Sequence, residues 1–140
     1  MAKKVKTTLA NNSETTEKKR RSLKNNRRRG NDYERQIAKE LRDLGFSGVV
    51  TSRSESKAMD DKKVDLIDKD DKLPFYTQIK RCIKYPNYVD IRNACPLKDK
   101  EFVLFWNVQK TTESTFRSEG EVVILDKKFF YELIKNYNNE

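Results

Sequence analysis

The stretch Phe75-Tyr76-Thr77-Gln78-Ile79-Lys80-Arg81-Cys82 alternates apolar and polar side chains in the manner of a β-strand. Because successive side chains of a strand point to opposite faces, Gln78 and Lys80 share one face of it. The segment Val64–Asp68 predicts a short strand just before it, with Asp65 interrupting an apolar run. If the two strands pair through the turn at 68–74, the side chains of Asp65, Gln78 and Lys80 converge.

The remaining segments predict an α/β protein, a sandwich with a mixed central sheet and helices on its faces. A helix precedes Gly48–Arg53, which is expected to be a strand, and residues 54–63 are expected to form a polar loop. Residues 83–100 are ambiguous, with a short helix possible near 89–94. Further predicted elements are a strand at Phe102–Val108, a polar turn at 110–120, a strand at Val122–Leu125 and a last helix capped by Asp126.

The first helix is expected to begin at Asn31 and to end near Leu44, where Gly45 supplies a left-handed cap. On a wheel of about 100° per residue, its apolar stripe consists of Tyr33, Ile37, Ala38, Leu41 and Leu44. Glu34 falls inside this stripe, so its carboxylate should point toward the sheet. A lone carboxylate is costly there unless it is paired, protonated or bound to metal.

Two interpretations of Glu34 remain open. In the first, Asn31 and Glu34 form a capping box at an exposed first turn. In the second, a divalent cation is held by Glu34, Asp65, the Gln78 side-chain oxygen and the Ile79 carbonyl, a set of oxygen ligands that suits Mg²⁺ or Mn²⁺. Asp60 or Asp61 could replace Asp65 as a ligand, and the polar face of the strand could also be an ordinary half-exposed surface.

The excess charge of the 140-residue chain lies at its N-terminal end. Residues 1–30 hold eleven Lys or Arg and two acidic residues, whereas residues 31–140 hold 20 of each sign. With few large apolar side chains, residues 1–29 are expected to form a disordered basic arm ahead of one domain, 30–140. Such an arm favours a nucleic-acid partner, contacted by Arg27, Arg28 and Arg29, although a solubilising tail is the alternative.

The composition excludes several kinds of site. The chain has no histidine, so a Ser-His or Cys-His triad and a histidine general base are excluded, and the spacing of Cys82 and Cys95 is unlike that of a zinc site. The two cysteines favour a reduced intracellular protein, with a disulfide as the alternative. No signal peptide and no membrane-spanning run is found. We expect a cytoplasmic protein, in a bacterium or a phage-infected host cell.

The order of these motifs resembles that of the PD-(D/E)XK nuclease superfamily: a helical Glu, then an Asp, then an acid or Gln two residues before a Lys. Gly30–Leu41 is similar to the opening helix of Holliday-junction-resolvase-like members, and Thr51–Ser56, Val64–Ile67 and Gln78–Arg81 resemble the later motifs of phage and bacterial proteins in that group. The resemblance implies a restriction-endonuclease-like core. It also implies that Glu34 and Asp65 bind metal and that Lys80 positions or activates the attacking water.

By the same resemblance, Arg53, Ser54 and Ser56 match a loop that contacts the scissile phosphate, and Arg81 is a further candidate for DNA binding. Two residues depart from the pattern: Val64 replaces a proline, and Gln78 replaces the usual acid, which should weaken metal binding. The expected function is a Mg²⁺- or Mn²⁺-dependent endonuclease acting on branched DNA. Cleavage of ordinary duplex and a non-catalytic binding module with a decayed site are the alternatives.

A resolvase acts on two equivalent strands, so a homodimer is possible. Phe102–Val108 and the last helix are candidates for its interface, although both could equally belong to the core.

Overall fold

The computed structural model describes residues 24–139, and the chain divides into two compact units, Met1–Asp32 and Tyr33–Glu140. The predicted arm lies outside the described residues up to position 23. Residues 24–29 are helical, so disorder was the wrong expectation for this part of the arm. Lys and Arg are good helix formers, and no proline interrupts the segment.

The first helix covers residues 24–43 and carries Glu34 in its interior. The predicted start at Asn31 is therefore wrong, and the capping-box interpretation of Glu34 is excluded. The predicted stripe is confirmed, because Tyr33, Ile37, Ala38 and Leu41 are buried together with Glu34. Leu44 is the exception, with 76% of its surface exposed just beyond the helix end.

The end of this helix follows the prediction. Gly45 has a φ of 111°. Its N–H donates to the Arg42 carbonyl (3.0 Å), while the N–H of Phe46 reaches back to the Leu41 carbonyl (3.1 Å). This pair of hydrogen bonds is the Schellman motif, which favours glycine at the left-handed position.

A two-stranded antiparallel sheet follows the first helix, with Val49 opposite Asp68. Its strands are shorter than predicted, and the expected polar loop at 54–63 is mostly helical. The elements of this segment are β1 (Val49–Thr51), α2 (Ser52–Glu55), α3 (Lys57–Asp61) and β2 (Leu66–Asp68). Ser56 caps α3, its hydroxyl accepting a hydrogen bond from the Met59 N–H (3.3 Å). Local side-chain caps of this kind can start a helix in a polar segment.

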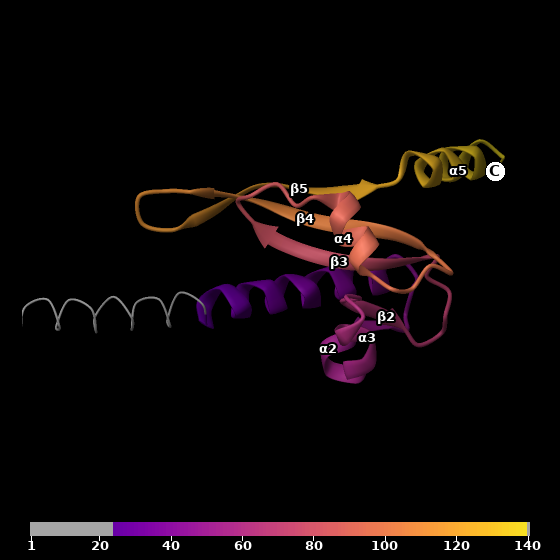
Figure 1. Ribbon diagram of the computed structural model, residues 1–140, viewed down its shortest axis with the longest axis horizontal. Helices are drawn as coiled ribbons and strands as arrows, with labels where there is room; N and C mark the ends of the chain where they lie inside the picture. The colour runs from indigo at the N-terminus through magenta and orange to yellow at the C-terminus, as the bar shows by residue number, and fades with distance from the viewer. Residues whose placement is uncertain (1–23, 140) are drawn as a thin grey trace, which may run out of the picture. The chain divides into compact units, whose positions relative to one another are not determined.

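The main sheet has three strands in the order β3-β4-β5, namely β3 (Phe75–Cys82), β4 (Glu101–Thr111) and β5 (Phe116–Leu125). β3 is parallel to β4, and β5 is antiparallel to it, so the sheet is mixed as predicted (Figure 1). The pairing of the two strands that was considered as a condition is not regular: β2 forms its ladder with β1, and β3 belongs to the other sheet. The predicted turn at 110–120 is also too long, since the hairpin strands extend into this polar segment.

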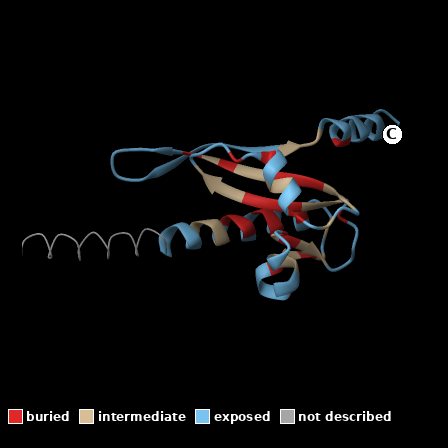
Figure 2. Ribbon diagram, viewed as in Figure 1, coloured by how far each residue is buried: buried red, intermediate tan, exposed pale blue. Residues whose placement is uncertain are grey.

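The two faces of the main sheet pack against different elements. On one face, Ile79 belongs to a buried cluster with Tyr33, Ile37 and Leu66, so the first helix and the smaller sheet cover that face. On the other face, α4 (Tyr88–Ala94) packs its Tyr88 into a cluster with Val64, Phe102 and Leu104. The buried residues concentrate on β3, β4 and the first helix (Figure 2). This arrangement confirms the predicted α/β fold with a mixed sheet flanked by helices.

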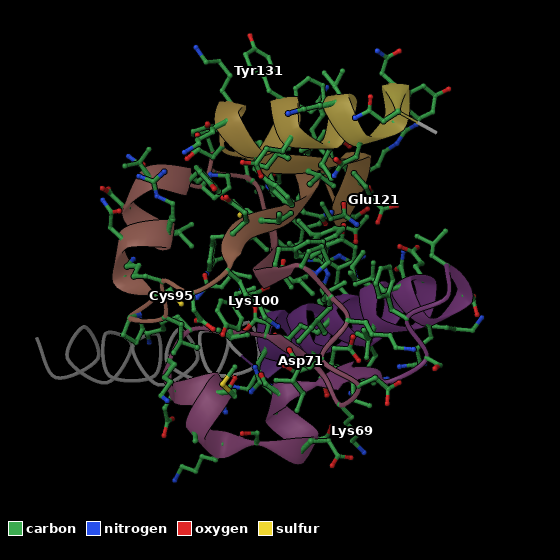
Figure 3. All side chains as sticks on the ribbon, turned by 90° about the vertical axis from the view of Figure 1, so that its right-hand side faces the viewer. Lys69, Asp71, Cys95, Lys100, Glu121 and Tyr131 are labelled. Atoms are coloured by element: carbon green, nitrogen blue, oxygen red, sulfur yellow. The ribbon has the colours of Figure 1, made fainter. Side chains whose placement is uncertain are left out.

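The last helix, α5 (Lys127–Asn138), begins as predicted at Asp126, whose carboxylate accepts a hydrogen bond from the Lys128 N–H. Phe129 is the one residue of α5 that is buried. Tyr131 projects from the side of the helix turned away from the strands (Figure 3). The other large apolar residues of α5 are also exposed: Phe130, Leu133, Ile134 and Tyr137.

Both cysteines of the chain are free thiols, with Cys95 buried and Cys82 half-buried, so the possible disulfide is absent. Among the described residues, no helix is both long enough and apolar enough to cross a membrane.

Candidate active site

Asp65 is held in place by two elements that flank it. Its backbone N–H donates to the Thr77 carbonyl of β3 (2.9 Å), and its own carbonyl accepts from the Ser52 N–H of α2 (2.8 Å). Its Oδ2 accepts a hydrogen bond from the Ile79 N–H (2.8 Å). Asp65 therefore lies against β3 although β2 and β3 form no regular ladder. Because the N–H and C=O of one residue in a strand point the same way, the Ile79 carbonyl faces this edge too.

Gln78 and Lys80 lie on one face of β3, opposite Leu104 and Trp106 of β4. Gln78 is 9% exposed and Lys80 is half-buried. Within residues 24–139, neither side chain takes part in a hydrogen bond or a salt bridge. A buried amide and a partly buried ammonium without structural partners are unusual, because such groups normally find a partner in the fold.

Glu34 approaches Asp65 from the first helix, which covers the face of the main sheet that carries Ile79. Its side chain is buried, and its Oε1 lies 3.5 Å from Nη2 of Arg53, the second residue of α2. The Arg53 side chain is 47% exposed, so this ion pair is long and open to water. Exposed pairs of this kind contribute at most about 1 kcal/mol, which does not offset the burial of a carboxylate.

Both carboxyls have raised pKa values, and the charge of Asp65 contributes to the shift of Glu34. Burial raises the pKa of Glu34, the negative charge of Asp65 raises it further, and Arg53 opposes both effects. Burial likewise raises the pKa of Asp65, although the Ile79 N–H and the Lys80 ammonium favour its charged form. Glu34 is buried and Asp65 is half-buried. Carboxyls whose pKa values are raised for these reasons fit a divalent cation, because the cation would offset the cost of removing their charges from water.

The carboxylates nearest to this pair do not form a larger cluster. Among residues 24–139, no group of three or more Asp, Glu, Cys or His side chains is placed to hold a metal ion. Asp60, on α3, raises the pKa of both Glu34 and Asp65 through its charge, and Asp61 is exposed. A cation at this site would therefore depend on two carboxylates supplemented by neutral oxygens such as that of Gln78.

The predicted phosphate-contacting residues of the 53–56 segment lie on two short helices. The guanidinium of Arg53 contacts Glu34. The hydroxyl of Ser54 hydrogen-bonds with Thr51, and the hydroxyl of Ser56 caps α3. Ser52 was missed by the sequence reasoning: it is fully buried, and its hydroxyl donates to the Val64 carbonyl. Ser52 thus fixes the chain just before Asp65, and no sequence signal distinguishes it from its serine neighbours.

Arg81 does not join Gln78 and Lys80. Its side chain lies on the face of β3 that carries Ile79, and its buried Nε has no hydrogen-bond partner among residues 24–139. Arg27, Arg28 and Arg29 lie in the helical part of the first unit, 24–32. DNA contacts by these four arginines remain predictions.

Comparison with known proteins identifies the relatives of this chain. The family model described as archaeal Holliday junction resolvase (Hjc) matches residues 25–99, which is more than half of the chain and includes Glu34, Asp65, Gln78 and Lys80. No match is found among curated proteins or among solved structures. The matched family lies within the PD-(D/E)XK nuclease superfamily, and it implies an endonuclease that acts on DNA. The chain therefore belongs to the archaeal Holliday junction resolvase family.

Proposed function

We propose that this protein is a divalent-metal-dependent endonuclease that cleaves phosphodiester bonds in branched DNA, in particular in four-way junctions. The observation that carries this proposal is the pairing of buried Glu34 with half-buried Asp65, whose pKa values are raised, near Lys80, which has no ion pair within residues 24–139. The fold alone does not need this arrangement, since such burial of charge is destabilising. The family match supports the same reaction class.

Glu34, Asp65 and Gln78 would hold the cation, with the Ile79 carbonyl at the same edge. Oxygen ligands of this kind favour Mg²⁺ or Mn²⁺. When bound, the cation supplies positive charge that stabilises the negative charge developing on the phosphate. Because Gln78 is neutral, affinity for the cation should be lower than with an acid at this position.

Lys80 would orient the attacking water or stabilise charge in the transition state. It lies two residues from Gln78 on one face of β3, and its charge is felt by the Asp65 carboxyl. A fixed positive group near the reacting phosphate acts mainly where water is partly excluded. The half-burial of Lys80 meets this condition.

Labelled four-way junction and duplex DNA, incubated with Mg²⁺, Mn²⁺ or EDTA, test this function. Wild type should cut the junction with either metal and not in EDTA. Asp65→Asn and Lys80→Ala should each lose activity by orders of magnitude while DNA binding persists. The matched controls are Asp43→Asn and Lys84→Ala, which change exposed residues and should keep activity. Full activity of either site variant would show that the site lies elsewhere.

A non-catalytic DNA-binding module is the second candidate, and the neutral Gln78 favours it. In that case wild type binds the junction but cuts nothing with either metal. Equal cutting of duplex and junction would instead indicate a nuclease without structural selectivity.

We also propose that the active form is a homodimer joined through α5. A junction presents two equivalent strands, and a two-fold dimer matches that symmetry. Of the two segments proposed as interfaces, β4 buries Phe102, Val103 and Leu104 in the core, whereas α5 leaves a row of large apolar residues exposed. Exposed apolar patches of this kind are typical of interaction surfaces.

A further inference from the structure

A pocket of about 350 Å³ lies between the first helix and the β1–α2 segment, separate from the face of β3 that carries Gln78 and Lys80. Three arginines line it, together with two hydroxyl residues and a small apolar residue: Arg35, Arg42, Arg53, Thr51, Ser54 and Ala38. Val50 completes the lining, and none of these residues is acidic.

The sequence of the first helix explains the shape of the pocket. Arg35, Ala38 and Arg42 follow at spacings of three and four, so they lie on one face of the helix. Ala38 is buried, and its small side chain leaves space between the two longer ones. The opposite wall comes from β1 and α2, where the Thr51 and Ser54 hydroxyls lie 2.9 Å apart.

One hydrogen bond to β1 partly fixes the guanidinium of Arg42, which extends from the first helix. Its Nη1 donates to the Val49 carbonyl (2.8 Å), which uses one of its five N–H groups. The planar guanidinium suits bidentate contact with phosphate oxygens, and hydroxyls can donate to the same oxygens. The lining therefore has the charge, the donors and the space for a phosphate group.

Arg53 connects this pocket to the candidate active site. It lines the pocket, and its Nη2 lies 3.5 Å from Glu34 Oε1. A DNA strand whose cleaved phosphate lies at Glu34 and Asp65 would thus place another of its phosphates within reach of the pocket. Phosphate contacts of this kind set the position of a strand without reading its sequence.

We propose that this pocket binds a phosphate of the DNA backbone other than the one that is cleaved, with Arg42 as its principal ligand. The proposal rests on DNA being the substrate and extends it by naming a second contact. Its role is to position the strand, so that the cleaved phosphate meets the two carboxylates.

Fluorescence anisotropy of the full chain with labelled four-way junction, in EDTA at 50–200 mM salt, tests the pocket. Loss of one phosphate contact lowers the salt slope of log K by about 0.9. Raising the salt from 50 to 200 mM weakens binding in both proteins. The factor by which it weakens Arg42→Gln should be about 3.5 times smaller than the factor for wild type. Arg42→Lys, which keeps the charge, should retain most of the slope. The matched control is Arg117→Gln, an exposed arginine of β5 outside the pocket, which should match wild type.

Neutral methylphosphonates placed singly along the strand locate the contact. A methylphosphonate at one position should weaken binding by wild type. The same substitution should not weaken binding by Arg42→Gln any further, because the two changes remove the same contact. Circular dichroism checks that Arg42→Gln folds, since its bond to the Val49 carbonyl is also lost. If Arg42→Gln fails to fold, Arg35→Gln, which changes another arginine of the pocket lining, takes its place in the methylphosphonate scan.

The pocket proposal fails if folded Arg42→Gln keeps the wild-type slope, or if Arg117→Gln loses as much. This outcome is independent of catalysis, because the assay contains no metal. If wild type binds the junction with the expected arginine dependence but never cleaves it, the nuclease proposal fails and the phosphate pocket stands.

Discussion

Replacing Glu34 by Gln distinguishes a functional role of its carboxylate from a role in stabilising the fold. In the metal-free protein the Glu34 carboxylate is buried, is repelled by Asp65 and has one long ion pair with half-exposed Arg53. An incompletely compensated buried polar group costs about 1–3 kcal/mol, whereas the exposed pair contributes at most about 1 kcal/mol. The free energy of unfolding of Glu34→Gln in EDTA should therefore equal that of wild type or exceed it by up to about 2 kcal/mol.

Thermal unfolding in EDTA at pH 7 measures this difference. With a conversion of about 4 °C per kcal/mol for a domain of this size, the Tm of Glu34→Gln should be unchanged or up to about 8 °C higher. The matched control is Glu40→Gln, an exposed glutamate of the same helix, whose stability should change by no more than about 0.5 kcal/mol.

Metal should reverse the order of the two proteins. At a free Mg²⁺ concentration of 100 times Kd, binding stabilises wild type by about 2.7 kcal/mol. A tenfold weaker affinity in Glu34→Gln reduces this gain to about 1.4 kcal/mol. A Tm of Glu34→Gln clearly below wild type in EDTA, or equal gains from Mg²⁺ in both proteins, would refute the reasoning from buried charge.

Three further predictions follow from the charges and the exposed surfaces. Because burial raises the pKa values of Glu34 and Asp65 above 4.5 and 3.8, their protonated forms stabilise the metal-free protein at low pH. The Tm of wild type relative to Glu34→Gln should thus fall as the pH rises from 4 to 8 in EDTA, and a rise would contradict the shifts. Deleting residues 1–23, which carry a net charge of +5, should flatten the salt dependence of binding and keep the junction-to-duplex preference. An unchanged slope in anisotropy titrations would exclude a phosphate contact by these 23 residues. Ile134→Asp on α5, where Ile134 is 48% exposed, should convert a dimer to monomers in analytical ultracentrifugation with little change in Tm, and a persisting dimer would place the interface elsewhere.

The sequence alone predicted the features that depend on short-range patterns. The 3.6-residue period places Tyr33, Ile37, Ala38 and Leu41 on one buried face and puts Glu34 among them. The alternation of β3 and the glycine at position 45 are equally local, and both follow from backbone geometry that neighbouring residues decide. The start of the first helix was misjudged because Asn31 carries a cap signal that the helix-forming residues before it override.

Only the tertiary structure decided how these elements meet. The contact of Arg53 with Glu34 joins residues 19 apart, and the bond from the Ile79 N–H to Asp65 joins residues 14 apart. The split into two sheets, the burial of Ser52 and the arginine pocket beside α2 likewise depend on the packing of distant segments. Such contacts form when the fold as a whole offsets the entropy of closing the loops between them, and no local pattern encodes that balance.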